Sequence, residues 1–126
     1  MKKSLSLFIL PLLWMVITVF LLTLPGKAFP TRSWFDDLWI DKWVHIAMFA
    51  ITVFIWAWAF SKYNPALANP RTFLLLAIVS LIYGIGMEFV QKYLVINRSF
   101  DMGDIIADAV GSAAGLFYSS KRFIKK

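Results

Sequence analysis

Three short groups of polar residues are spaced by three or four positions, the spacing that places side chains on one face of a helix. In chain order they are Asp41, Lys42 and His45, then Gly84, Glu88 and Gln91, then Arg98, Asp101, Asp104 and Asp108. Carboxylates, an imidazole and an amide can together bind a cation, transfer a proton or hydrogen-bond a polar ligand. The sequence therefore holds the components of one polar site, provided that the surrounding elements bring the three groups together.

These groups border or lie within long apolar segments. Of the 126 residues, 60% are hydrophobic and 16% charged, against roughly 45–50% and about 25% in soluble domains. This composition excludes a disordered chain and argues against a soluble enzyme, and the lack of cysteine excludes disulfides and thiolate sites. The apolar runs cover residues 5–24, 43–60, 72–90 and 104–120.

Each run is long enough to cross a bilayer as a helix, because a span needs about 20 apolar residues and its backbone must bond internally. We predict an all-α membrane protein, a bundle of four transmembrane helices that forms a single domain over residues 1–126. The first run has a second interpretation, a signal peptide cleaved near Gly26-Lys27-Ala28. Signal cores have about 7–15 apolar residues, so we predict a retained span.

The charged residues predict the orientation of the bundle. One side holds eight cations and no acid: Lys2, Lys3, Lys62, Arg71, Lys121, Arg122, Lys125 and Lys126. All seven acids fall on the other side, or at that end of a span. Because cytoplasmic loops are enriched in Lys and Arg, we expect both termini in the cytoplasm. The net charge of +6 is thus a topology signal, and we expect no nucleic-acid partner.

With this orientation every group of the polar site lies toward the outer leaflet. Charged groups are costly at membrane depth, and the deepest groups are His45, Glu88 and Asp108. Glu88 and Asp108 should therefore face the bundle interior, each with a partner, and the available partners are His45, Lys42 and Arg98. A polar network that only ties the helices together is the structural alternative.

Small residues have a simpler role: we expect Ala107, Gly111 and Gly115, and also Gly84 and Gly86, to serve helix packing.

The ordered motifs resemble one family. They read Asp41-Lys42-x-x-His45-x-x-x-Phe49, Gly84-x-x-x-Glu88-x-x-Gln91 and Arg98-x-x-Asp101-x-x-Asp104-x-x-x-Asp108-x-x-Gly111. Over residues 41–115 the chain resembles the VanZ-like family of small bacterial membrane proteins. Asp108 stands where many members have Asn. The resemblance implies location in the bacterial inner membrane and a link to glycopeptide (teicoplanin) resistance, but it implies no reaction.

Three functions are compatible with these residues. The first is binding of a lipid headgroup, a lipid-linked wall precursor or a lipoglycopeptide at the outer leaflet, with membrane lipids as partners. Arg98 would contact an anionic group bidentately, with Lys42 as a point charge. The expected ligand-binding residues are Lys42, His45, Glu88, Gln91, Arg98, Asp101, Asp104 and Asp108.

The second function is an intramembrane enzyme that acts on a phosphorylated lipid. Mg²⁺ or Mn²⁺ would be held by oxygens, with Glu88, Asp101, Asp104 and Asp108 as candidates. His45, oriented by Asp41, would be the general acid or base, so the catalytic candidates are His45, Asp41 and Glu88. The third is a proton or ion pathway, but the predicted cytoplasmic halves of the spans lack the ionisable groups that it needs.

Overall fold

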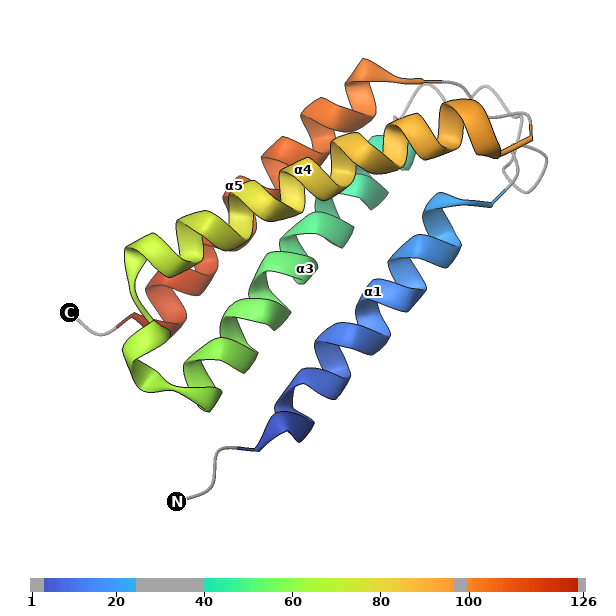
Figure 1. Ribbon diagram of the computed structural model, residues 1–126. Helices are drawn as coiled ribbons and strands as arrows, with labels where there is room; N and C mark the ends of the chain where they lie inside the picture. Colours follow the sequence, from blue (N-terminus) through green and yellow to red (C-terminus); the bar gives the residue numbers. More distant parts are fainter. Residues whose placement is uncertain (1–3, 25–39, 97–99, 125–126) are drawn as a thin grey trace.

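The computed structural model describes residues 4–24, 40–96 and 100–124, and these residues are helical apart from short turns and ends (Figure 1). A 3-10 turn at Leu5–Phe8 leads into helix α1, Ile9–Leu22. The chain continues with α3, Ile40–Tyr63; a 3-10 turn, Pro65–Leu67; α4, Pro70–Leu94; and α5, Met102–Phe123. None of the described residues lies in a strand, which confirms the predicted all-α class.

Three segments are long and apolar enough to cross a membrane: Leu5–Leu22, Ile40–Tyr63 and Pro70–Leu94. α5 has 22 residues but has Asp104 in its first turn and Lys121 and Arg122 in its last. α3 and α4 extend beyond the apolar runs predicted for them, because the polar residues at their ends also adopt helical conformation. The structure thus supports a membrane protein through these three helices.

The turns and helix starts follow from local capping chemistry. The Asn69 side chain accepts a hydrogen bond from the Thr72 N–H at 2.9 Å, and Pro70 occupies the first turn of α4. Asp101 does the same for α5, where it accepts from the Gly103 N–H at 2.8 Å. Both residue types satisfy N–H groups that have no partner within the helix. These caps fix where α4 and α5 begin.

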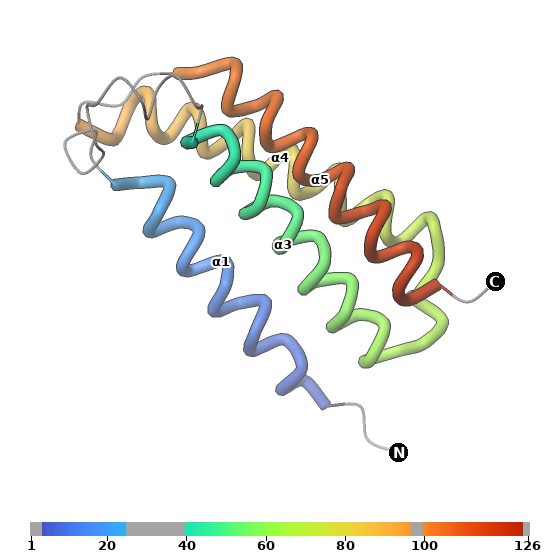
Figure 2. Tube along the Cα trace, turned by 180° about the vertical axis from the view of Figure 1, so that it is seen from behind, coloured from blue at the N-terminus to red at the C-terminus, as the bar shows by residue number. Residues whose placement is uncertain are grey.

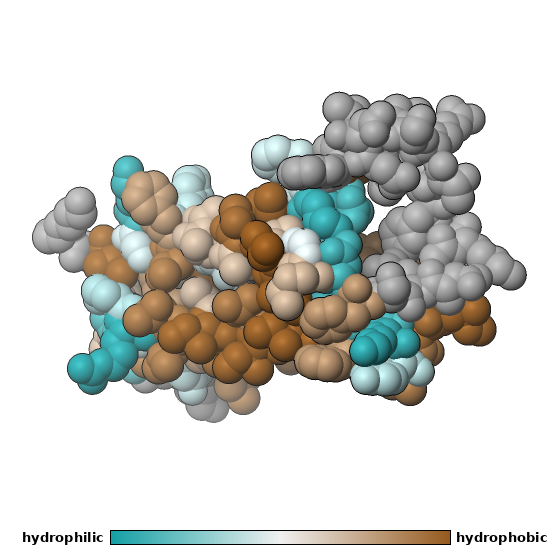
Figure 3. Space-filling view, turned by 90° about the horizontal axis from the view of Figure 1, so that it is seen from above, coloured by the Kyte–Doolittle hydropathy of each residue, from teal (hydrophilic) through white to brown (hydrophobic). Residues whose placement is uncertain are grey.

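The helices run alternately up and down the bundle (Figures 1 and 2). α3 and α5 form the most extensive interface, α4 packs against both, and α1 lies at the edge against α3 and α4. The start of α1, the turn between α3 and α4 and the end of α5 share one end of the bundle (Figure 1). Apolar side chains cover much of the face seen in Figure 3, with hydrophilic residues toward its two ends.

Two glycines explain how closely α3 and α5 approach. A Cβ atom at Gly111 would collide with the carbonyl oxygen of Ile46, and one at Gly115 would lie 2.7 Å from that of Ala50. Small residues therefore let the two backbones touch, as predicted for this face. Gly86 differs, because a Cβ there would meet no atom of the described residues within 4 Å. The prediction that Gly86 serves packing is wrong.

Candidate functional site

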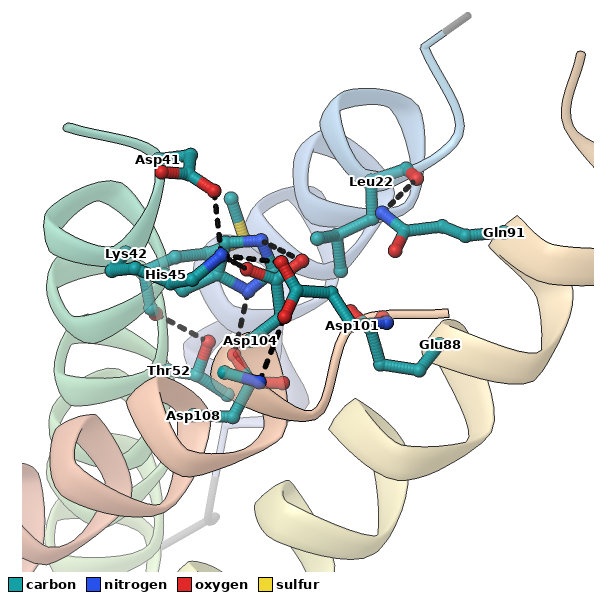
Figure 4. Close-up of polar contacts among 12 residues, drawn as sticks. Leu22, Asp41, Lys42, His45, Thr52, Glu88, Gln91, Asp101, Asp104 and Asp108 are labelled. Carbon is teal, nitrogen blue, oxygen red and sulfur yellow. Dashed lines mark hydrogen bonds and ion pairs between the residues drawn. The ribbon is translucent and has the colours of Figure 1, made fainter. Parts of the chain in front are cut away.

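The polar groups meet at one end of the bundle, where α3 begins, α4 ends and α5 begins (Figure 4). Because these helices alternate in direction, residues far apart in sequence come together there. α3 supplies Asp41, Lys42 and His45, α4 supplies Glu88 near its last turns, and α5 supplies Asp104 and Asp108. Asp101 joins them from the N-cap of α5.

Lys42 is the centre of the outer part of the site. Its Nζ donates to Asp41 Oδ2 at 2.7 Å, to Asp101 Oδ2 at 2.6 Å and to Asp104 Oδ1 at 2.7 Å. An ammonium group has three donors, so all of them are engaged by carboxylates. The geometry leaves Lys42 as a structural counter-ion of the acids rather than a free donor for an anionic ligand.

Asp101 shows the electrostatic effect of this arrangement. Its partial burial favours the neutral acid, but the hydrogen bond and charge of Lys42 and the N–H groups of Gly103 and Asp104 outweigh that effect. The pKa of the Asp101 carboxyl is therefore lowered. Asp101 is a stable anion at the mouth of the site, where its side chain is 43% exposed.

His45 is the centre of the inner part of the site and is buried. Its Nδ1 lies 2.7 Å from Asp108 Oδ1. A carboxylate accepts hydrogen bonds, so Nδ1 donates to Asp108, and a neutral ring then has its lone pair at Nε2. Nε2 faces Asp104 Oδ2 at 3.7 Å, beyond hydrogen-bond distance.

His45 is one of the partners expected for Asp108, but the residue that orients His45 differs from the expected one. The spacing of Asp41 and His45 suggested that Asp41 orients the imidazole, but Asp41 bonds to Lys42 instead. Asp108, from another helix, orients His45. The i, i+4 rule describes only neighbours on one helix and does not show which partner a facing helix provides.

Glu88 completes the inner part. It is 1% exposed, and its Oε2 accepts a hydrogen bond from the Asp101 backbone N–H at 3.1 Å. Ligand atoms of His45, Glu88 and Asp104 all lie within 4.8 Å of one another. Two buried carboxylates and an imidazole nitrogen thus converge on one point.

In a second group of candidate ligands, Asp41, Asp101 and Asp104, the ligand atoms also lie within 4.8 Å of one another. The Lys42 ammonium group already bonds to all three. A metal ion there would compete with Lys42 for the same oxygens. The group of His45, Glu88 and Asp104 therefore fits a metal ion better.

Gly84 provides the space for the Asp108 carboxylate. A Cβ atom at Gly84 would lie 2.5 Å from Asp108 Oδ2 and 3.0 Å from the Phe49 ring. A side chain at this position would displace Asp108 from His45. The sequence indicated a packing role for Gly84, and the structure shows that its packing partner belongs to the site.

Gln91 lies at the margin of the site, toward α1. Its Nε2 donates to the Leu22 carbonyl at 2.7 Å, and it is fully buried. Its Oε1 has no hydrogen-bond partner among the described residues. Gln91 thus attaches the end of α1 to α4, and its role as a ligand residue stays a prediction.

The sequence analysis missed the hydroxyl contacts that join α1 to the bundle. Thr18 Oγ1 bonds to Tyr83 OH at 2.9 Å, and Trp14 Nε1 donates to Thr52 Oγ1 at 2.9 Å. The signal was present, since each polar atom interrupts an apolar run and needs a partner in lipid. Arg98, predicted to bind an anionic group, and the cleavage motif at 26–28 lie outside the described residues.

No family model, no curated protein and no solved structure matches this chain. The chemistry of the site is therefore argued from its charges. Among the described residues, five carboxylates (Asp41, Glu88, Asp101, Asp104 and Asp108) share the cluster with one ammonium group and one imidazole. Close carboxylates repel one another, so the site favours a cation over a bare anion.

Proposed function

We propose that this protein is a VanZ-like, four-span protein of the bacterial inner membrane with both termini in the cytoplasm. The ordered motifs over residues 41–115 support the family, and the alternating helices support the topology. α5 has 22 residues, about 33 Å of helix, enough for the fourth span. The cations at residues 62, 71, 121 and 122 favour the cytoplasm for the end where α1 starts and α5 finishes.

The polar site, on this topology, binds a divalent cation that in turn holds the phosphorylated headgroup of an outer-leaflet lipid. The expected ligands of the cation are His45, Glu88 and Asp104. This deepens the expected headgroup-binding role, because the acids around Lys42 leave it no donor for a phosphate. A cation between the acids and a phosphate makes the two negative groups compatible.

The observation that carries the proposal is the environment of His45. Its Nδ1–H is held by Asp108, and its Nε2 faces Asp104 without a hydrogen bond. Histidines that bind metals almost always donate their other ring N–H to a carboxylate or a carbonyl, which orients the ring. In the neutral ring, Nε2 is an acceptor that faces a second acceptor, Asp104 Oδ2, at 3.7 Å, and a cation between the two atoms stabilises the pair.

The set of donors favours Mg²⁺ or Mn²⁺ among the common ions. Carboxylate oxygens suit these hard cations, whereas zinc sites usually include more nitrogen or sulfur ligands. Mg²⁺ is commonly bound by one or two carboxylates together with phosphate groups of the ligand. A lipid phosphate would therefore complete the coordination that three side chains begin.

The test is Mn²⁺ binding by the detergent-purified protein, measured by isothermal titration calorimetry. We expect wild-type protein to bind one ion per chain, and Glu88→Gln and Asp104→Asn to lose most of this binding. Asp41→Asn is the matched control, since it also removes one carboxylate but not a proposed ligand. Equal loss in all three variants would indicate only a general effect of negative charge and would contradict the assigned ligands.

A second titration tests the headgroup. Phosphatidic acid in mixed micelles should bind to the wild-type protein more tightly with Mn²⁺ than with a chelator. Phosphatidylcholine in the same micelles is the control for general lipid binding. Phosphatidic acid binding that is independent of the ion, or equal for the two lipids, would contradict a cation-bridged headgroup.

A metal-assisted enzyme that acts on the phosphorylated lipid is the second candidate. Three side-chain ligands leave coordination positions open, and an ion in such a site can activate bound water. Release of phosphate or of diacylglycerol from phosphatidic acid, dependent on Mn²⁺ and absent from Glu88→Gln, would favour the enzyme. Binding without turnover would favour the non-enzymatic role.

A further inference from the structure

An apolar cavity of about 280 Å³ lies between α1, α3 and α4. Met15 lines it from α1, Trp56 and Phe60 from α3, and Leu76 and Val79 from α4. None of the described side chains that line the cavity is charged. The polar site is therefore not the only feature of the bundle that could hold part of a ligand.

Contacts at both ends of the cavity attach α1 and the turn before it to α3 and α4. At one end the ring of Phe8 packs against those of Trp56 and Phe60, with centroids 6.1 Å and 5.3 Å away. At the other end are the hydrogen bonds of Thr18 with Tyr83 and of Trp14 with Thr52. Val79 both lines the cavity and is 61% exposed, so the cavity opens sideways on the surface of the bundle.

The cavity lies at the depth of lipid chains. On α3, Thr52 at its edge is seven residues from His45, about 10 Å along the helix. At that depth a bilayer offers hydrocarbon chains and no water. The volume is slightly below the roughly 300–1,000 Å³ of pockets that enclose a whole ligand, so the cavity suits a segment of a chain.

Only a few side chains separate the cavity from the polar site. Tyr83 lines the cavity, and its neighbour Gly84 borders Asp108 Oδ2. The Phe49 ring lies 6.0 Å from that of Tyr83, measured between centroids, and also borders Gly84. The cavity and the polar site are therefore close neighbours within the bundle.

We propose that the cavity holds an acyl chain of the lipid whose headgroup binds at the polar site, a proposal that rests on the function proposed above. The chain enters from the bilayer beside Val79, between α1 and α4. The ligand class is then an amphiphile with a phosphorylated headgroup and a flexible hydrocarbon chain. A water-soluble phosphate ester would fill the polar site but leave the cavity unused.

The test is photolabelling in vesicles with phosphatidic acid that has a diazirine midway along one acyl chain, followed by peptide mapping. We expect label on the residues that line the cavity, from α3 and α4. Leu76→Trp, which fills the cavity, should lose most of this label. Leu75→Trp is the matched control, because Leu75 is 55% exposed and does not line the cavity.

A second variant, Ser80→Leu, fills the cavity from another position. It serves as the test if Leu76→Trp does not fold. Label spread evenly over exposed apolar faces, or equal in the Leu75 and Leu76 variants, would overturn the proposal. The proposal would also be overturned if the cavity is not labelled and the protein instead crosslinks to a second copy through α1. Fluorescence-detected gel filtration confirms that each variant is folded.

Diacylglycerol with the same diazirine, and Glu88→Gln with the phosphatidic acid probe, separate this inference from the headgroup proposal. Strong cavity label from phosphatidic acid that is lost with diacylglycerol and in Glu88→Gln supports both. Equal cavity label from both lipids, unaffected by Glu88→Gln, would keep the chain in the cavity but contradict headgroup binding at the site.

Discussion

Asp101 joins the start of a helix to the polar site through three separate hydrogen bonds. Oδ1 accepts from Gly103 and caps α5, Oδ2 accepts from Lys42, and the backbone N–H donates to Glu88. The position of α5 along its axis is therefore coupled to the positions of Lys42 on α3 and Glu88 on α4. A single residue sets the geometry of three helices at this end of the bundle.

Lys42→Met is expected to destabilise the protein by about 2 kcal/mol, because the acids lose their charge partner. The effect is smaller than for a fully buried ion pair, since the Lys42 side chain is partly exposed. The variant leaves three carboxylates close together without their shared cation. Thermal unfolding in detergent, followed by tryptophan fluorescence, measures the change. Lys62→Met is the control, because Lys62 lies on the same helix but outside the site.

The loss of stability caused by Lys42→Met should depend on pH in one direction. Lys42 lowers the pKa of folded Asp101, so the stabilisation is complete above the ordinary aspartate pKa of about 4 and declines as pH falls through the lowered folded value. The difference between wild-type protein and Lys42→Met should thus be largest near neutral pH and shrink below pH of about 4. A difference that grows with acidity would contradict this account of Asp101.

Asp108→Asn is expected to weaken Mn²⁺ binding by roughly 10–100-fold, the usual effect of changing a group that orients a metal ligand. Asn keeps the size and can still accept from His45 Nδ1, but it lacks the negative charge. Calorimetry measures the effect. Ser112→Ala is the matched control one turn further along α5, where the hydroxyl has no partner among the described residues. Equal affinity in Asp108→Asn and wild-type protein would remove Asp108 from the site.

The elements show what the sequence could predict and why the rest was beyond it. Apolar runs predicted four helices, and the spacing by three or four predicted which polar residues share a face. Helix spacing does not specify the facing helix, so the sequence offered His45 as one of three partners for Asp108 and could not choose among them. The distance between helices depends on how residues such as Gly84 and Gly86 pack. No local sequence pattern shows that these two glycines have different surroundings.

Gly111→Ala should destabilise the α3–α5 interface by about 1–3 kcal/mol, the usual cost of overpacking. The added methyl group would meet the Ile46 carbonyl oxygen, which belongs to the backbone and cannot rotate away. Gly86→Ala is the control in an open position and should stabilise the helix slightly, by up to about 1 kcal/mol. Thermal unfolding in detergent compares the two, and similar stability would contradict the close approach.

At the scale of the whole molecule, the charges separate along the bundle. The carboxylates gather at one end, whereas Lys62, Lys121 and Arg122 lie near the other. The proposed orientation predicts which end a reagent outside the cell can reach. The chain has no cysteine, so single cysteines report position without background.

Leu94→Cys should react with a membrane-impermeant maleimide in intact spheroplasts, because Leu94 is 77% exposed at the end of α4 beside the site. Ala66→Cys, in the turn between α3 and α4, should react only after the membrane is permeabilised. Gel shifts after labelling give both results. The reverse pattern would place the termini outside the cytoplasm.

The central claim is that His45, Glu88 and Asp104 hold a divalent cation. The most direct measurement is electron spin echo envelope modulation of Mn²⁺ bound to the detergent-solubilised protein, which detects a nitrogen bonded to the ion. The proposal predicts coupling to one histidine nitrogen, which is lost in His45→Gln. Mn²⁺ with water and oxygen ligands only, or a nitrogen signal that persists in His45→Gln, would contradict the site.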